Sequence, residues 1–289
     1  ADGDQKALRI LLGQLRQQGH VQSFTPLWVL NAIAVTGDTT AINQLALAPL
    51  VASIEPDITI QSPPRTSQTL ATSSAAGPNL SAIHAPDVWA LGDQGQGVVV
   101  ANMDTGVDYT HPDLAGRWRG GSNSWYDPYG QHATPTDLNG HGTWTMGVMV
   151  GGSSSGTTIG VAPQASWIAV KIFNDSGVAT SSAIHLGFQW LLDPDNNPAT
   201  ADAPDVVNNS WALSTAGGCD LSFAPDLASL VAAGITPVFA AGNYGPNGST
   251  SVSPSNNPDA LAVGAINDTG AIYTGSSRGP TSCGGSARS

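Results

Sequence analysis

The chain has 289 residues, of which 40% are hydrophobic and 10% are charged, and its formal net charge is −12 at pH 7. This length accommodates one large domain and a small one, and the hydrophobic fraction is ordinary for a folded protein. An acidic surface repels phosphate, so the charge argues against a nucleic-acid partner. No apolar stretch is long enough to span a bilayer, which argues against a membrane-spanning protein.

The first 62 residues are expected to form a small α+β domain, which at this size is marginally stable alone. Residues 63–78 are rich in Ser, Thr, Pro and Ala without any period, so we interpret them as a linker, with a processing point between Gln61 and Pro78. The elements expected before the linker are a helix over 8–15, a strand over 28–35, a helix capped by Asp38 or Thr39 that extends through Leu47, and a strand over 51–54.

Residues 79–289 alternate between apolar strand runs and helical patterns. Almost continuously apolar strands are typical of a sheet that is covered on both faces, so the pattern predicts an α/β fold with a doubly wound parallel sheet. The expected strands cover 97–103, 167–173, 206–211, 236–241 and 260–266, and the expected helices cover 141–150, 181–192 and 225–233.

Three polar residues stand where these strands or helices meet loops. Sites in open α/β sheets form beyond the carboxyl ends of the strands. There, Asp104 can orient a histidine, His141 can act as a general base, and the Asn243 amide can donate to an oxyanion. Taken alone, each of them is more often a turn or structural hydrogen-bonding residue, and His132 and His185 have no motif around them.

The two cysteines, Cys219 and Cys283, permit one disulfide, which the oxidising environment of an exported protein would favour. Glycine, proline and few charges suit such an extracellular protein. The alternative is a pair of free, buried thiols, because sequence does not show whether the two residues are close. The chain begins at Ala1 without an initiating Met or a signal segment, so we interpret it as a fragment or a processed form.

Together the motifs resemble those of the subtilase family of serine peptidases. The order of aspartate, histidine and asparagine motifs matches that family, and Asp104 precedes His141 by 37 residues. Asn208–Trp211 and Ser276–Pro280 are most similar to the bacillopeptidase F-like group. The motifs that carry the resemblance are Asp104–Asp108 with His111–Leu114, His141–Thr143 with Gly147 and Gly160–Pro163, and Ala240–Asn243.

The resemblance implies a secreted, monomeric endopeptidase that acts on polypeptides and requires no organic cofactor. His141 would be the base, Asp104 its orienting partner and Asn243 an oxyanion donor. Substrate would bind as an added strand, at a site formed by Ser210, Trp211, Ala241 and Gly242. Residues 1–62 resemble the family's inhibitor I9-like propeptide, which would occupy the cleft, and Pro86–Trp89 resembles the start of the mature enzyme.

Two departures from the family pattern concern the nucleophile and the metal. The family's Gly-Thr-Ser-Met-Ala motif is missing, only nine residues follow Pro280, and Ser282, Ser286 and Ser289 are expected to be loop serines. We therefore expect this chain to be inactive, with a non-catalytic pseudopeptidase or peptide-binding domain as the alternative. Asp113 matches a calcium ligand of some relatives, but loop 151–156 contains no Asn or Asp, so calcium is possible but no metal site is predicted.

Overall fold

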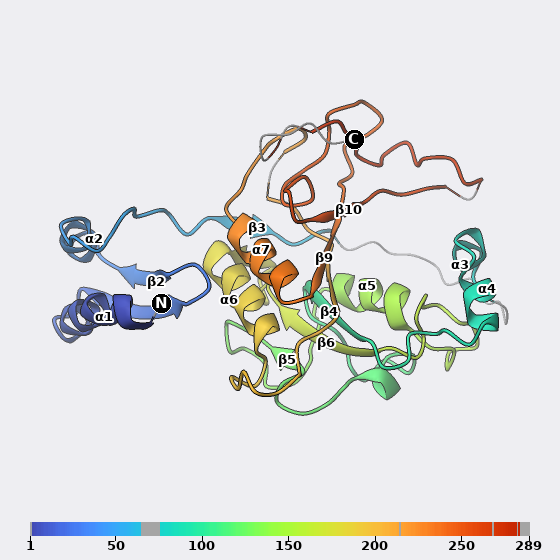
Figure 1. The fold of residues 1–289 in the computed structure, drawn as a ribbon, viewed down its shortest axis with the longest axis horizontal. Coiled ribbons are helices and arrows are strands. Elements are labelled where there is room, and N and C mark those ends of the chain that lie inside the picture. The colour runs from blue at the N-terminus through green and yellow to red at the C-terminus, as the bar shows by residue number, and fades with distance from the viewer. Residues whose placement is uncertain (1, 65–75, 214, 268, 282, 284–289) are drawn as a thin grey trace.

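The structure is a computed structural model that describes residues 2–64, 76–213, 215–267, 269–281 and 283 (Figure 1). Most of the predicted linker and Ser282, Ser286 and Ser289 therefore lie outside the described residues. A central α/β domain carries a smaller N-terminal unit that projects from one side of it (Figure 1). None of the helices in the described ranges is long and apolar enough to cross a membrane.

The central domain is built on a six-stranded sheet in the order β10-β9-β8-β4-β6-β5, in which every pair of neighbours is parallel. All strands therefore end at the same edge, as the doubly wound fold class predicts, and that prediction is confirmed. The strands are β4 (Val99–Asp104), β5 (Trp125–Tyr126), β6 (Ser166–Lys171), β8 (Val206–Asn209), β9 (Thr236–Ala240) and β10 (Leu261–Val263).

Helices cover both faces of this sheet, as the apolar strands predict. Figure 1 shows α6 (Ser181–Leu192) and α7 (Ala224–Ala232) on one side and α5 (His141–Val150) on the other. In β4 the side chains alternate, so Met103 packs with the α6 and α7 side while Val100 packs with the α5 side. Each fully buried side chain of this size contributes about 1.5–3 kcal/mol. The same alternation places Asp104 on the α5 face.

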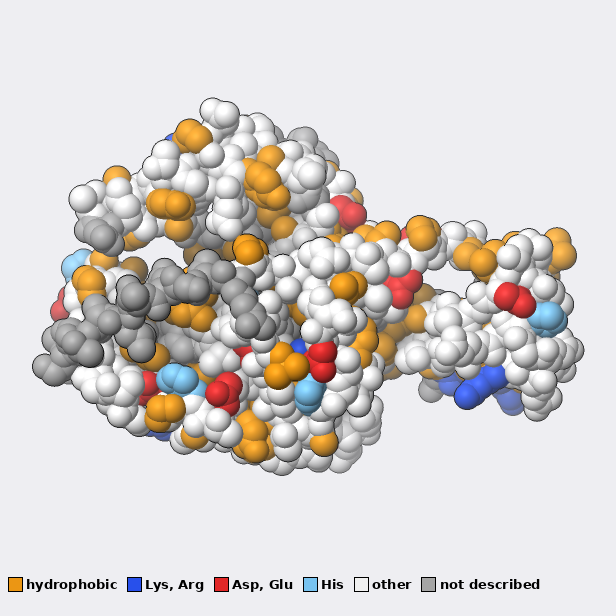
Figure 2. Space-filling model, turned by 180° about the vertical axis from the view of Figure 1, so that it is seen from behind, with side chains coloured by type: hydrophobic (Ala, Val, Ile, Leu, Met, Phe, Trp, Pro, Cys, Tyr) orange, Lys and Arg blue, Asp and Glu red, His pale blue; other side chains and the backbone are white. Residues whose placement is uncertain are grey.

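The N-terminal unit has a core of its own. Its elements are α1 (Asp2–Gln17), β1 (Val21–Leu27), β2 (Ala32–Gly37) and α2 (Thr39–Ala46), and its buried core includes Leu12, Leu15 and Leu45. Asp38 caps α2 by accepting a hydrogen bond from the Ala41 N–H, as predicted. The Lys and Arg side chains of α1 lie on this projecting unit (Figure 2).

Two strand predictions in this region are wrong. Residues 28–35 do not form one strand, because a turn at 28–31, with Asn31 in the left-handed region at φ 51°, joins β1 to β2. β1 was not predicted because Pro26 and several polar residues interrupt its pattern. Residues 51–54 form no strand, since they have no pairing partner in the structure, and the pairing occurs instead at β3 (Thr59–Gln61).

β3 joins the N-terminal region to the central domain. It pairs antiparallel with β7 (Val178–Thr180), which directly precedes α6. The Trp28 N–H also donates to Gln189 of α6 at 2.7 Å. The short elements α3 (Pro78–Ala82), α4 (Ala85–Ala90) and the 3-10 turn Ala115–Arg117 complete the described structure.

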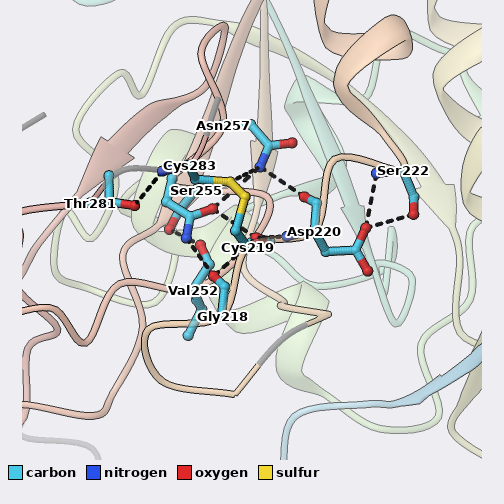
Figure 3. Close-up of a disulfide and its surroundings, with 11 residues drawn as sticks. Gly218, Cys219, Asp220, Ser222, Val252, Ser255, Asn257, Thr281 and Cys283 are labelled. Carbon is cyan, nitrogen blue, oxygen red and sulfur yellow. Dashed lines mark hydrogen bonds between the residues drawn. A yellow bond between two sulfur atoms is a disulfide. The ribbon is translucent and has the colours of Figure 1, made fainter. Parts of the chain in front are cut away.

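Cys219 and Cys283 are joined in a disulfide that closes a separation of 64 residues, with their Cα atoms 5.2 Å apart. Figure 3 shows the bond between the loop before α7 and the last described residue. Beside it, Asn257 donates to the Asp220 carbonyl at 3.0 Å and lies 3.7 Å from the Cys283 sulfur. The disulfide and the Asn257 side chain thus hold Cys283 against two loops of the central domain.

Candidate active site

Asp104 is the last residue of β4, and its side chain is 1% exposed. The strand ends here because Gly106 follows in the left-handed region, at φ 114°. The Thr105 N–H donates to Asp104 Oδ1 at 2.6 Å. Strand alternation and the turn together hold the carboxylate beneath the first turn of α5.

His141 is the first residue of α5, and the residue after it must be glycine. A Cβ on Gly142 would overlap the Gly106 carbonyl oxygen and would lie 3.1 Å from the Asp104 Cβ. Without a side chain at position 142, the helix start can approach the end of β4 closely. The close approach of His141 to the end of β4 thus has a specific steric basis.

The two predicted residues are in direct contact. Nδ1 of His141 lies 2.8 Å from Oδ1 and 2.9 Å from Oδ2 of Asp104. Burial raises the pKa of Asp104, and the hydrogen bonds from His141 and Thr105 oppose that effect. Burial alone would lower the pKa of His141, but its hydrogen bond to Asp104 and the negative charges of Asp104 and Asp137 raise it overall. The pair can therefore hold a proton on the imidazole and release it.

Asp137 organises the loop before His141 and was missed by the sequence reading. Its Oδ1 accepts hydrogen bonds from the N–H groups of Asn139 and Gly140, and its Oδ2 accepts from the N–H and the hydroxyl of Thr143. Such a carboxylate satisfies donors at a helix N-terminus that have no partner within the helix. An acidic residue four positions before a helix-initial histidine is the signal that could have identified it.

Asn102 is a second residue that the sequence reading missed, because it stands inside an apolar strand run. Its side chain is buried and donates to the Gly142 carbonyl and to the Thr145 hydroxyl, both at 3.0 Å. Its oxygen accepts from Asn208 of β8 at 2.9 Å. Asn102 thus connects the His141 helix to two strands of the sheet.

The predicted oxyanion donor Asn243 and the predicted substrate-binding residues Ala241 and Gly242 lie after β9, two strands from β4. Asn243 is exposed, and no hydrogen bond of its side chain to another described residue is recorded. Gly242 is in the left-handed region at φ 111°, and its carbonyl accepts from the Ser277 N–H at 2.9 Å. The Ala241 N–H donates to Val263 of β10. Two strand spacings correspond to about 10 Å, so Asn243 is on the same sheet edge as Asp104 but is not in contact with the pair.

The predicted strand-addition residues after β8 have different environments. Ser210 is half-buried, and its hydroxyl accepts from Asn208 at 3.0 Å. Trp211 is only 5% exposed, and its ring packs against Phe188, Phe223 and Phe239. The Trp211 side chain is therefore part of the core and does not line an exposed site.

Near the imidazole, Trp144 is half-exposed, with its ring centroid 6.1 Å from that of His141. Among the described residues, no serine hydroxyl is recorded as bonded to the His141 ring, whose recorded hydrogen bonds both go to Asp104.

The two histidines that have no motif around them are also paired with carboxylates. His132 pairs with Asp175, and His185 pairs with Asp226.

Three carboxylates within the described residues, Asp193, Asp195 and Asp202, are close enough to one another to hold a metal ion. Asp193 and Asp195 both accept the Asn197 N–H, at 2.7 and 2.9 Å, and Asp202 accepts from Asn123 at 3.0 Å. These bonds shape the loop that follows α6, so the cluster is explained without a metal.

Comparisons with known proteins agree with this geometry. Residues 95–288 match the subtilase family. Bacillopeptidase F of Bacillus subtilis (strain 168) is 34% identical over 307 aligned positions, which cover 97% of this chain and 21% of that protein. Subtilisin E of the same organism is 35% identical over 255 positions, covering 86% of this chain and 60% of that protein. The minor extracellular protease Vpr is 34% identical over 194 positions.

This chain thus spans about a fifth of bacillopeptidase F and three fifths of subtilisin E. The match to the family includes β4, α5 and β9, which carry or directly precede the three predicted site residues. The chain therefore belongs to the subtilase family.

Proposed function

We propose that this chain is part of a serine endopeptidase precursor in which His141 is the general base and Asp104 orients it. The observation that carries the proposal is the contact between His141 Nδ1 and the buried carboxylate of Asp104. With Nδ1 engaged, Nε2 is the atom that takes the proton of an attacking serine hydroxyl. The base then returns this proton to the leaving amine, and a water molecule that it activates hydrolyses the acyl intermediate.

Asn243 is the proposed oxyanion donor. Its amide is exposed on the sheet edge where Asp104 also lies, and it is not engaged by another described residue. An amide donor of this kind stabilises the charge that develops on the carbonyl oxygen of the tetrahedral intermediate.

The nucleophile is proposed to lie on a segment that this chain does not include. What supports this is that His141 makes no recorded bond to a serine among the described residues. The 289-residue chain by itself is then inactive. The rival proposal is a non-catalytic, peptide-binding relative, which the same observation also favours.

Residues 1–62 are proposed to be the propeptide, with its end bound in the substrate cleft. In support, β3 adds to β7 as an antiparallel strand, and the Ser62 N–H continues this pairing by donating to the Gly177 carbonyl at 2.8 Å. The Ser62 hydroxyl also accepts from Asn139, two residues before His141, at 3.4 Å. A polypeptide substrate would take the place of β3 by the same backbone pairing. The alignment with bacillopeptidase F, which covers 97% of this chain, includes this region.

We propose that the reaction needs no organic cofactor and that no tight calcium site forms at Asp113. Calcium takes six to eight oxygen ligands. Around Asp113, loop N–H groups are directed inward instead, since Ser155 donates to Oδ1 at 3.1 Å and Gly152 donates to the backbone oxygen at 2.8 Å. Of the Asp113 carboxylate oxygens, Oδ2 is the one that is buried without a hydrogen-bond partner among the described residues. One such oxygen is too few ligands for a calcium site.

We also propose that the protein is secreted and monomeric and that it has no nucleic-acid or membrane partner. The disulfide supports an oxidising compartment, and one chain supplies both the cleft and the strand added to it. Peptidase relatives of this chain include one named extracellular and one named intracellular, so compartment is best tested by fractionating cells that produce the protein.

The experiment that tests the activity compares this chain with a C-terminally longer form that carries a downstream serine segment. Casein digestion is expected from the longer form alone, and His141→Ala in that form should abolish it. A folded longer form that binds peptides without cleaving them would contradict the enzyme and favour the binding protein.

A further inference from the structure

Lys171, the last residue of β6, is a buried cation that the proposed chemistry does not use. Its side chain is 2% exposed. A buried lysine is costly unless its donors find acceptors. Its Nζ donates to the Thr105 carbonyl at 3.0 Å and lies 3.4 Å from Oδ1 of Asp175. One of its two recorded partners is therefore the residue that follows Asp104.

Thr105 is bonded through every polar group it has. Its N–H donates to Asp104 Oδ1, its hydroxyl donates to Asp137 and accepts from the Gly142 N–H, and its carbonyl accepts from Lys171. The first three bonds join the turn to β4, to the loop before α5 and to α5. The bond from Lys171 comes from the neighbouring strand β6, and the Ile172 N–H, which directly follows that strand, also donates to the Asp104 carbonyl at 3.0 Å.

Asp175 is itself held in place on the far side of Lys171. It accepts from His132 Nε2 at 2.9 and 3.1 Å, and its N–H donates to Gln131 at 3.0 Å. The hydrogen bond from His132 lowers the pKa of Asp175, which keeps this carboxylate ionised. A continuous series of polar contacts thus runs from His132 through Asp175 and Lys171 to Thr105.

We propose that Lys171 is a positioning residue, which fixes the Thr105 peptide and so holds Asp104 in hydrogen-bonding position against His141, with Asp175 and His132 anchoring the lysine. This proposal rests on the proposed function in one respect, which is that the Asp104–His141 pair serves catalysis. The alternative is a purely structural lysine that borders a cavity of about 210 Å³, together with Thr105 and Asn139.

The test reads the pair directly, by NMR of the 289-residue chain. The readouts are the Nδ1–H resonance of His141 and its pKa, in the wild type, Lys171→Met and Lys171→Arg. If Lys171 positions Asp104, Lys171→Met weakens the hydrogen-bonded Nδ1–H signal and lowers the pKa of His141 by about 1 unit. Lys171→Arg, which restores a donor, returns both toward the wild type.

The chain contains an internal control for these readouts. His185 of α6 lies 2.9 Å from the buried Asp226 of α7, in a histidine–carboxylate pair on the other side of the sheet. Its signals should not change in a folded Lys171→Met variant. An unchanged Nδ1–H signal and an unchanged pKa of His141 in such a variant would overturn the proposal. A rise in the His141 pKa would also overturn it, since loss of a nearby positive charge without displacement of Asp104 has that sign.

If Lys171→Met does not fold, Asp175→Asn and His132→Gln replace it, because both side chains are partly exposed. Each substitution is expected to weaken the His141 Nδ1–H signal and to lower the His141 pKa by a smaller amount than Lys171→Met. If neither substitution changes these readouts, the proposal is overturned. These NMR readouts do not involve a nucleophile, so they test the role of Lys171 separately from the peptidase activity. If the Lys171 variants change the His141 signal and pKa as expected but the longer form does not cleave casein, only the proposed function is contradicted.

Discussion

The carboxylate of Asp57 accepts a hydrogen bond from the N–H of Ser182, in the first turn of α6, at 2.8 Å, although 125 residues separate them in sequence. The hydroxyls of Ser181 and Ser182 donate to the same carboxylate at 2.7 and 2.6 Å. Asp57 lies just before β3, so the contact combines an N-terminal helix cap with the docking of β3 on β7.

Asp57→Ala is therefore expected to loosen β3 from β7, because a lost cap costs about 1 kcal/mol. The measurement is amide hydrogen exchange of Thr59–Gln61, which should become faster. Asp93→Ala is the matched control, an exposed aspartate for which no side-chain hydrogen bond is recorded, and it should leave that exchange unchanged. Equal exchange in both variants would contradict the docking role.

Gly142→Ala is expected to destabilise the chain by about 1–3 kcal/mol, because the new methyl group overlaps the Gly106 carbonyl oxygen. Gly147→Ala is the matched control in the same helix, since its added Cβ would meet only Ile159 at an ordinary 3.6 Å. Urea denaturation measures both. Equal midpoints for the two variants would show that the approach of α5 to β4 is not sterically limited.

Asp104→Asn is expected to lower the pKa of His141. The hydrogen bond to Asp104 and the charge of that residue raise this pKa, while burial, which the substitution leaves in place, lowers it. A histidine titration by NMR measures the change, with His185 as reference. A His141 pKa that stays raised in the variant would mean that Asp104 is not its main partner.

The raised pKa also predicts how stability depends on pH. A proton held more tightly in the folded chain stabilises it fully below the ordinary histidine pKa of about 6.5. This contribution is lost as the pH rises through the raised folded value. The loss of unfolding free energy caused by His141→Gln should therefore be greater near about pH 5.5 than near about pH 9. Equal losses at both pH values would contradict the assignment.

Replacing both Cys219 and Cys283 with Ser is expected to cost about 2–5 kcal/mol, because the bond closes a long loop of the unfolded chain. Urea denaturation of the double variant should match that of the reduced wild type. An unchanged midpoint would show that the C-terminal segment is held by its other contacts alone.

Five of the six strands of the sheet, together with α5 and α6, could be predicted from sequence because their patterns are local, whereas the two-residue β5 was not predicted. α5 and α6 start and end where the periodicity places them, and Thr180 caps α6 through the Ala183 N–H. β1 and β3 could not be predicted in the same way. β1 contains Pro26, and β3 is a strand only because β7 lies beside it.

The same distinction applies to the site. His141 stands between two glycines, and Asp104 stands two residues before Gly106, which marks both of them in sequence. Asn102 and Lys171 lie within apolar strand runs, and their importance comes from partners on other elements, such as Asn208 and Thr105. No local pattern indicates such long-range contacts.

Under the proposed function, this chain carries the base of a serine peptidase without its nucleophile. Labelling of the folded 289-residue chain with a fluorophosphonate probe, read by intact mass and peptide mapping, tests it most directly. No adduct on any serine is expected. An adduct on Ser282 or another serine that disappears in His141→Ala would contradict it, and would make this chain a complete peptidase.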